Sequence, residues 1–131
     1  MKNKIYYENF KDAIERNIKK IPVVHKKLKA AGVQYVMSSW IDLHGIPKTK
    51  PVPMSDFEQL CLGKGPQFAA HSISFVPELT PADSDQIMLP DLDCVYICPW
   101  DKTMAIIFAD LYWEDKPVSY THLTLPTNRE V

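Results

Sequence analysis

The apolar residues of this chain change their spacing near position 33, and that change sets the expected fold class. Before it, apolar residues recur every three or four positions, as on one face of a helix: Phe10, Ile14, Ile18 and Ile21. After it, residues 33–42, VQYVMSSWID, are rich in β-branched and aromatic residues, which is typical of a strand. Further strand patterns follow, so the sequence predicts an α+β domain in which a sheet packs on a few helices.

The helical region is expected at residues 7–31, with an interruption at Pro22. Proline lacks the amide hydrogen that an interior helix position donates, but it suits the first position of a helix. A second helix is therefore expected to begin at Pro22 and to end at Gly32.

A short third helix is predicted at DFEQLCLG. Ser55 and Glu58 have the spacing of a capping box that would open this helix, and Gly63 would end it. The segment at residues 63–86 contains three prolines and two glycines and is expected to be a long, mostly irregular loop.

Three more strands are expected. The segment KTKPVPM suits an edge strand, because prolines cannot donate to a central ladder. Residues 94–100 and 104–113 are two apolar runs joined by a connection of hairpin length, Asp101-Lys102-Thr103.

The stretch WIDLHGIPKTKPVP contains a turn, and two roles are considered for it: to hold a substrate, or only to join two strands. The short acidic side chain of Asp42 can bond the backbone, and Gly45 can take a positive φ. We interpret the stretch as a turn that fixes the geometry of the sheet, with His44 exposed. Substrate binding by Asp42 is the alternative.

Composition excludes several classes of protein. The chain has 131 residues and a net charge of −1, without the basic balance of a nucleic-acid-binding protein. It contains no signal peptide and no stretch approaching the ~20 apolar residues of a membrane span, so a cytoplasmic location is expected. Three cysteines without C-x-x-C spacing fit reduced thiols in a core better than a disulfide or a metal site: Cys61, Cys94 and Cys98.

Several motifs in one order resemble the N-terminal β-grasp (ubiquitin-like) domain of glutamine synthetases. They are WIDLHG, KPVP, FAAHSI, SDQIMLPD and CPWDKTMAIIFADLYWEDKPV, and they cover about residues 30–118. These motifs resemble the type III (GlnT-like) branch, which includes γ-glutamylmethylamide synthetases, more than they resemble the ordinary ammonia-using enzymes. The expected organisation is an N-terminal helical segment at 1–32, the β-grasp domain at 33–118, and a non-native tail at 119–131 that resembles adapter or vector read-through.

This resemblance implies part of an ATP-dependent ligase that joins glutamate to ammonium or a small amine such as methylamine. In the family, ATP phosphorylates the γ-carboxylate of glutamate and the amine then displaces phosphate. ATP and Mg²⁺ or Mn²⁺ are held by a large C-terminal domain, so the fragment alone is expected to be inactive and to bind no cofactor or metal. The family forms ring-shaped oligomers whose N-terminal domain closes a neighbouring subunit's active site.

The resemblance also places the candidate catalytic residues. The family's F-D-G-S-S-I loop, whose aspartate helps to hold ammonium and take its proton, matches residues 68–73. Ala69 stands where that aspartate would be, so an apolar amine would suit the site better than ammonium. Ser72 and His71 lie in the same loop, and His71 is its one obvious titratable group; the alternative for His71 is an ordinary surface residue.

Asp85 matches the acidic residue of the family's S-D motif beside the amine site, and it is the third catalytic candidate. The alternative is that Ser84 and Asp85 cap a turn. A function of another class also stays open, namely a stand-alone β-grasp module that binds a protein partner by strand addition or through an apolar face.

Overall fold

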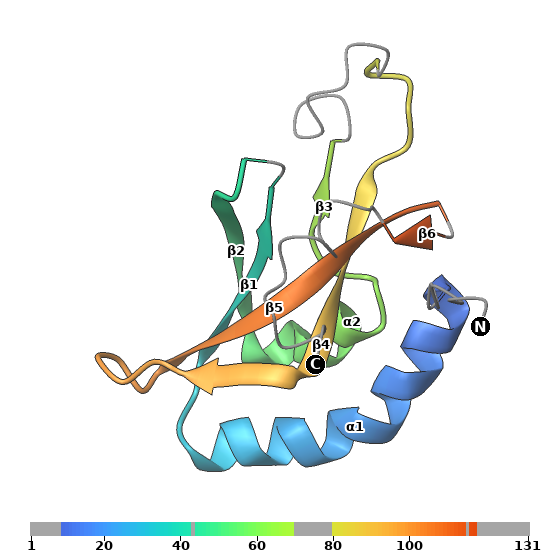
Figure 1. Ribbon diagram of the computed structural model, residues 1–131. Coiled ribbons are helices and arrows are strands. Elements are labelled where there is room, and N and C mark those ends of the chain that lie inside the picture. Colours follow the sequence, from blue (N-terminus) through green and yellow to red (C-terminus); the bar gives the residue numbers. More distant parts are fainter. Residues whose placement is uncertain (1–8, 43, 70–79, 115, 118–131) are drawn as a thin grey trace, which may run out of the picture.

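The computed structural model describes residues 9–42, 44–69, 80–114 and 116–117, which form a mixed sheet with two helices packed against it (Figure 1). The strand order is β2-β1-β5-β4-β3, and β6 pairs with β5 outside this path. The strands are β1 Tyr35–Ile41, β2 Pro47–Pro53, β3 Gln67–Phe68, β4 Gln86–Ile97, β5 Met104–Trp113 and β6 Lys116–Pro117. The expected combination of a sheet with helices is confirmed.

The centre of the sheet is a parallel pair, β1 with β5, and the other pairings are antiparallel. The predicted proline-containing strand is β2, and it lies at one edge of the sheet as expected. The opposite edge is β3, yet Lys50 of β2 reaches it, with its Nζ 2.6 Å from the carbonyl oxygen of Gln67. The sheet is therefore curled so that its two edges approach each other.

The predicted interruption at Pro22 is wrong, because a single helix, α1, runs over Phe10–Ala30. The proline leaves the carbonyl of Ile18 without its helical donor, and both residues are exposed, so water can take that place. The helix bends as it wraps around the sheet (Figure 1). Gly32, with φ of +85°, directly follows the C-cap residue of α1, as the sequence predicted.

Ser55 is not the N-cap residue that the sequence predicted. A 3₁₀ turn at Met54–Asp56 comes first, and α2 then covers Phe57–Cys61 with Asp56 as its N-cap. The amide of Met54 donates to the carbonyl oxygen of Gln34, which draws the chain into this turn directly at the end of β2. Tertiary pairing therefore overrides the local capping signal.

The first strand of the predicted hairpin is longer than expected. It begins at Gln86 rather than at position 94, and its pairing with β5 shifts register between Pro90 and Val95. The hairpin itself is confirmed. Its connection is closed by Asp101, which accepts hydrogen bonds from the amide and hydroxyl of Thr103.

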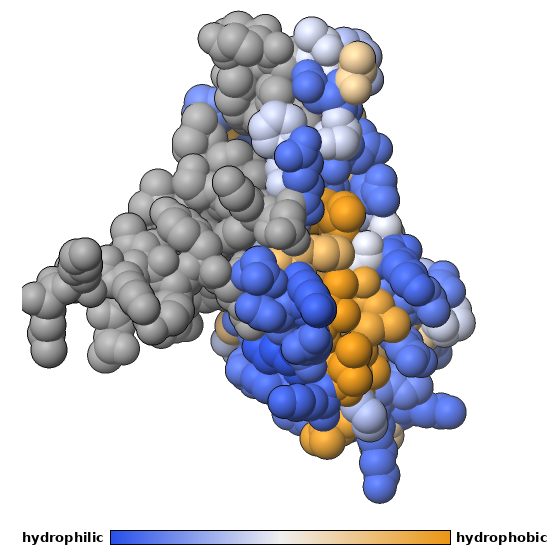
Figure 2. Space-filling view, turned by 90° about the vertical axis from the view of Figure 1, so that its right-hand side faces the viewer, coloured by the Kyte–Doolittle hydropathy of each residue, from blue (hydrophilic) through white to orange (hydrophobic). Residues whose placement is uncertain are grey.

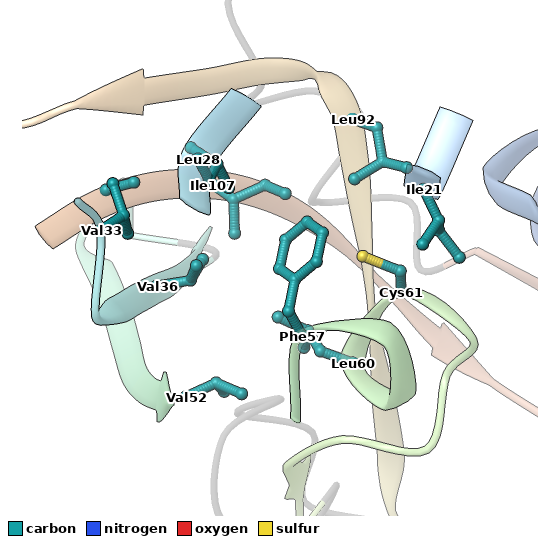
Figure 3. Close-up of a cluster of buried hydrophobic side chains, with 11 residues drawn as sticks. Ile21, Leu28, Val33, Val36, Val52, Phe57, Leu60, Cys61, Leu92 and Ile107 are labelled. Carbon is teal, nitrogen blue, oxygen red and sulfur yellow. The ribbon is translucent and has the colours of Figure 1, made fainter. Parts of the chain in front are cut away.

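The main core lies between the helices and the sheet (Figure 3). Phe57 of α2 is fully buried in it, and its ring stacks on that of His25 from α1, with centroids 5.8 Å apart. A second cluster lies inside the curl of the sheet and consists of Trp40, Met88, Ala109 and Leu111, with Phe68 packed against it. A third cluster joins α1 to β4 and β5 through Ala13, Leu89 and Tyr112. Among the described residues the core therefore has three parts.

One side of the molecule shows an apolar band flanked by hydrophilic surface (Figure 2). Among the described residues, no helix is both long enough and apolar enough to cross a membrane.

Candidate functional site

Two of the positions that match the family's amine-site motifs lie at the same end of the β3–β4 pair. Ala69 directly follows β3, and Asp85 directly precedes β4. The two strands are antiparallel, and their last pair joins Phe68 to Gln86. Extended by one residue, this register places Ala69 opposite Asp85, where paired side chains have Cβ atoms about 5 Å apart.

The segment before Asp85 is fixed by its neighbours. Asp83 closes a turn by accepting the amide hydrogen of Thr80 at 2.6 Å. The indole Nε1 of Trp113 donates to the carbonyl oxygen of Ser84 at 3.1 Å and to its hydroxyl at 2.9 Å. The turn-capping role considered for Ser84 therefore falls to Asp83, and the exposed Asp85 follows a segment that is anchored to β5.

The other two catalytic candidates, His71 and Ser72, lie outside the described residues, as does the segment at 119–131. Their predicted roles, and the non-native origin of that segment, stay predictions.

Sequence reasoning missed two residues that hold this end of the sheet. Lys50 places its Nζ 4.2 Å from the centroid of the Phe68 ring, and that ring packs edge-on against Trp40 at 5.3 Å. Trp113 holds Ser84 as described above. Lys50 shares a strand face with the buried Val52, two residues away, so an inward-facing lysine was readable from the alternation of β2. The contacts of Lys50 with β3 could not be read from the sequence.

The turn after β1 is built around Asp42, which is fully buried. One oxygen of its carboxylate accepts the amide hydrogens of His44 at 2.9 Å and Ile46 at 2.8 Å, and the other lies 3.7 Å from Nζ of Lys48. His44 is exposed, as predicted, and Gly45 has φ of +77°. Through these bonds Asp42 fixes the turn. This agrees with the preferred interpretation, in which the turn sets the geometry of the sheet.

Burial alone would raise the pKa of Asp42. The hydrogen bonds from Ile46 and His44, together with the positive charge of Lys48, outweigh it and hold the pKa below its ordinary value of 3.8. A carboxyl group whose pKa is lower in the folded state stabilises the fold above its unfolded pKa, and this contribution is lost as the pH falls through the folded pKa.

We therefore expect Asp42→Asn to be less stable than the wild type at pH 7, with a smaller difference at pH 3. Urea unfolding followed by circular dichroism at both pH values measures this. Asp56→Asn, a change of the same kind at an exposed N-cap without a side-chain hydrogen bond, is the control and should show no such trend. A difference of equal size at both pH values would contradict the account of Asp42.

In the parts of the chain that the structure describes, no three His, Cys, Asp or Glu side chains come close enough together to hold a metal ion. Burial raises the pKa of the Cys61 thiol to about 12, which leaves it protonated and suited to packing. A hollow of about 600 Å³ lies elsewhere, between the end of α1 and the start of α2, and its lining includes His25, Lys29 and Glu58.

Comparison with known proteins finds similarity to a glutamine synthetase and to a glutamate–methylamine ligase. The chain is 39% identical over 87 residues to a glutamine synthetase of Rhizobium meliloti, which covers 66% of this chain and 19% of that protein. It is 29% identical over 93 residues to a glutamate–methylamine ligase of Methyloversatilis universalis, which covers 71% of this chain and 21% of that protein. No protein-family model matches the chain.

Solved structures show the same fold. Two structures of GmaS, one described as an ADP complex and one as free of ligand, superpose with TM-scores of 0.64 and 0.65 at 24% identity. Each match covers 72% of this chain and 21% or 22% of the GmaS chain. The chain thus spans about a fifth of the length of the relatives that it matches.

Proposed function

We propose that this chain, which is homologous to glutamine synthetases and to a glutamate–methylamine ligase over about a fifth of their length, is the N-terminal part of an ATP-dependent glutamate–amine ligase. The rest of such a ligase would supply the sites for nucleotide, divalent metal and glutamate. The part described above would contribute the side of the site that receives the amine.

The observation that carries this proposal is the register of β3 and β4. Two motifs that lie 16 positions apart in the sequence, and that match the amine site independently, end next to each other through this pairing, because Ala69 and Asp85 continue it.

Asp85 and Ala69 would have different roles at this site. A primary amine is largely protonated at neutral pH, and the exposed carboxylate of Asp85 attracts that cation. Ala69 adds only a methyl group beside it and follows Phe68, which packs on the apolar cluster inside the curl. This arrangement favours an amine that carries a small alkyl group, with Asp85 doing the work of the aspartate that Ala69 replaces.

The test begins by extending the natural reading frame beyond codon 118 and expressing the product. Phosphate release that requires both glutamate and ATP is then measured with methylamine and with ammonium. We expect Asp85→Asn to raise the KM for the amine roughly tenfold, since a hydrogen bond to a charged group contributes about 1.5 kcal/mol or more. Ala69→Asp should shift the preference towards ammonium.

Asp56→Asn is the matched control, because Asp56 is an exposed aspartate in the turn before α2 and should leave the KM unchanged. An extended product without glutamate-dependent phosphate release would refute the proposed function. An active product in which Asp85→Asn matches Asp56→Asn would refute the role of Asp85.

The proposal also includes finer features of the fold and of the whole ligase. We infer a β-grasp topology, which the parallel pairing of β1 with β5 between antiparallel neighbours supports. Assembly into a ring, use of Mg²⁺ or Mn²⁺ with ATP, and a cytoplasmic location stay predictions for the whole ligase. The GmaS structure described as an ADP complex supports the use of a nucleotide.

The second candidate is the stand-alone interaction module, and one observation favours it. Figure 2 shows an apolar band on one side of the molecule. Among the described residues, α1 also exposes two apolar side chains, Ile18 at 53% and Val23 at 71%. Such a surface fits a protein contact. A missing remainder of the ligase would leave the same surface bare, so the reading frame beyond codon 118 separates the two functions.

A further inference from the structure

Strand β3 is too short to hold its own position. It contains two residues and forms two pairs with β4, whereas β2 is paired with β1 along all seven of its residues. A ladder of two pairs contributes little stability by itself. The placement of β3, and of Ala69 directly after it, therefore depends on what its side chains and carbonyl groups contact.

One residue of β2 makes two such contacts at once. The Nζ of Lys50 donates to the carbonyl oxygen of Gln67 at 2.6 Å and lies 4.2 Å from the centroid of the Phe68 ring. The first is a charge-assisted hydrogen bond, and the second is a cation–π contact on a ring that Trp40 already contacts edge-on. Both residues of β3 are thus tied to the firmly paired edge of the sheet.

We propose that Lys50 is a positioning residue for the amine side of the site. Its ammonium group joins the two edges of the curled sheet and fixes β3, so that Ala69 stays opposite Asp85. The part concerning the amine rests on the proposed function, and the part concerning β3 does not.

Hydrogen exchange on the 131-residue chain tests directly whether Lys50 holds β3 in place. Lys50→Met keeps the length and apolar stem of the side chain but removes both polar contacts. We expect amide exchange in the β3–β4 pairing to become about tenfold faster, while exchange in the β1–β5 pairing stays unchanged. Lys50→Arg, which retains a charged donor, should restore most of the protection.

Lys48→Met is the matched control on the same face of β2. Lys48 lies near Asp42 rather than β3, so this variant should leave exchange in the β3–β4 pairing unchanged. Unchanged exchange in Lys50→Met, or an equal change in Lys48→Met, would contradict the proposal that Lys50 fixes β3.

Kinetics of the extended ligase tests the positioning role. We expect Lys50→Met to raise the KM for methylamine about tenfold with little change in the KM for ATP, and Lys50→Arg to recover it. An unchanged KM in an active enzyme would overturn the positioning role. If the extended product has no ligase activity at all, the proposed function and the positioning role fall together, and the exchange experiment still decides whether Lys50 braces β3.

Discussion

Replacing Asn17 by Leu should lower the free energy of unfolding by roughly 3 kcal/mol, because it removes the side-chain donor that two buried carbonyl groups share. Asn17 is fully buried in α1. Its Nδ2 donates to the carbonyl oxygen of Cys61 at 2.9 Å, at the end of α2, and to that of Pro90 at 3.1 Å, where β4 shifts its register. One side chain thus joins three elements, and leucine has the same number and branching of heavy atoms but no hydrogen-bond donor.

Lys19→Leu is the matched control for Asn17→Leu. It introduces the same residue into the same helix at an exposed position, and lysine and leucine have nearly equal helix propensities. We expect the control to change the free energy of unfolding by no more than about 0.5 kcal/mol. Urea unfolding followed by circular dichroism measures both variants. A loss below about 1 kcal/mol for Asn17→Leu would show that the two carbonyls find other partners.

The position of Asn17 illustrates what the sequence could not reveal. A polar residue among the helical apolar positions looks like part of the solvated face, and its two acceptors are 44 and 73 positions away in the chain. The same holds for Lys50, whose partners Gln67 and Phe68 lie on the opposite edge of the sheet. Contacts between distant segments leave no local pattern when one sequence is read alone.

Features with a local cause were predictable. Gly32 and Gly63 were expected to end helices, and each follows the C-cap residue of its helix. The edge position of β2 followed from its prolines, and the turn at Asp42 followed from its short carboxylate. Each of these signals lies within a few residues of the structure that it determines.

The errors have a common physical origin in tertiary contacts that override local signals. Pro22 is a helix breaker by rule, but the packing of Ile21 and Leu28 into the core holds α1 as one helix. The strand expected at residues 94–100 begins at Gln86, because β4 pairs with β5 on both sides of a register shift between Pro90 and Val95. For the site, sequence reasoning selected Asp85 and Ala69 from motifs, and the β3–β4 register added their proximity.

Replacing Gly63 by Ala should destabilise the protein by about 3 kcal/mol, whereas Gly32→Ala should cost only about 1 kcal/mol. Both glycines have a positive φ, +75° and +85°, so the backbone strain of an added side chain is similar. Their surroundings differ. A Cβ at Gly32 would meet nothing within 4 Å, but a Cβ at Gly63 would lie 2.6 Å from Cζ of Phe10.

Phe10 cannot move aside without cost, because its ring also packs edge-on against Tyr112 of β5, with centroids 5.5 Å apart. The extra cost at Gly63 is therefore the displacement of a ring that joins α1 to the sheet. Removing the ring tests this: in a Phe10→Ala background, Gly63→Ala and Gly32→Ala should destabilise equally, as measured by urea unfolding of all variants. If the difference of about 2 kcal/mol persists there, strain local to α2 causes it, and Gly63 does not depend on the docking of α1.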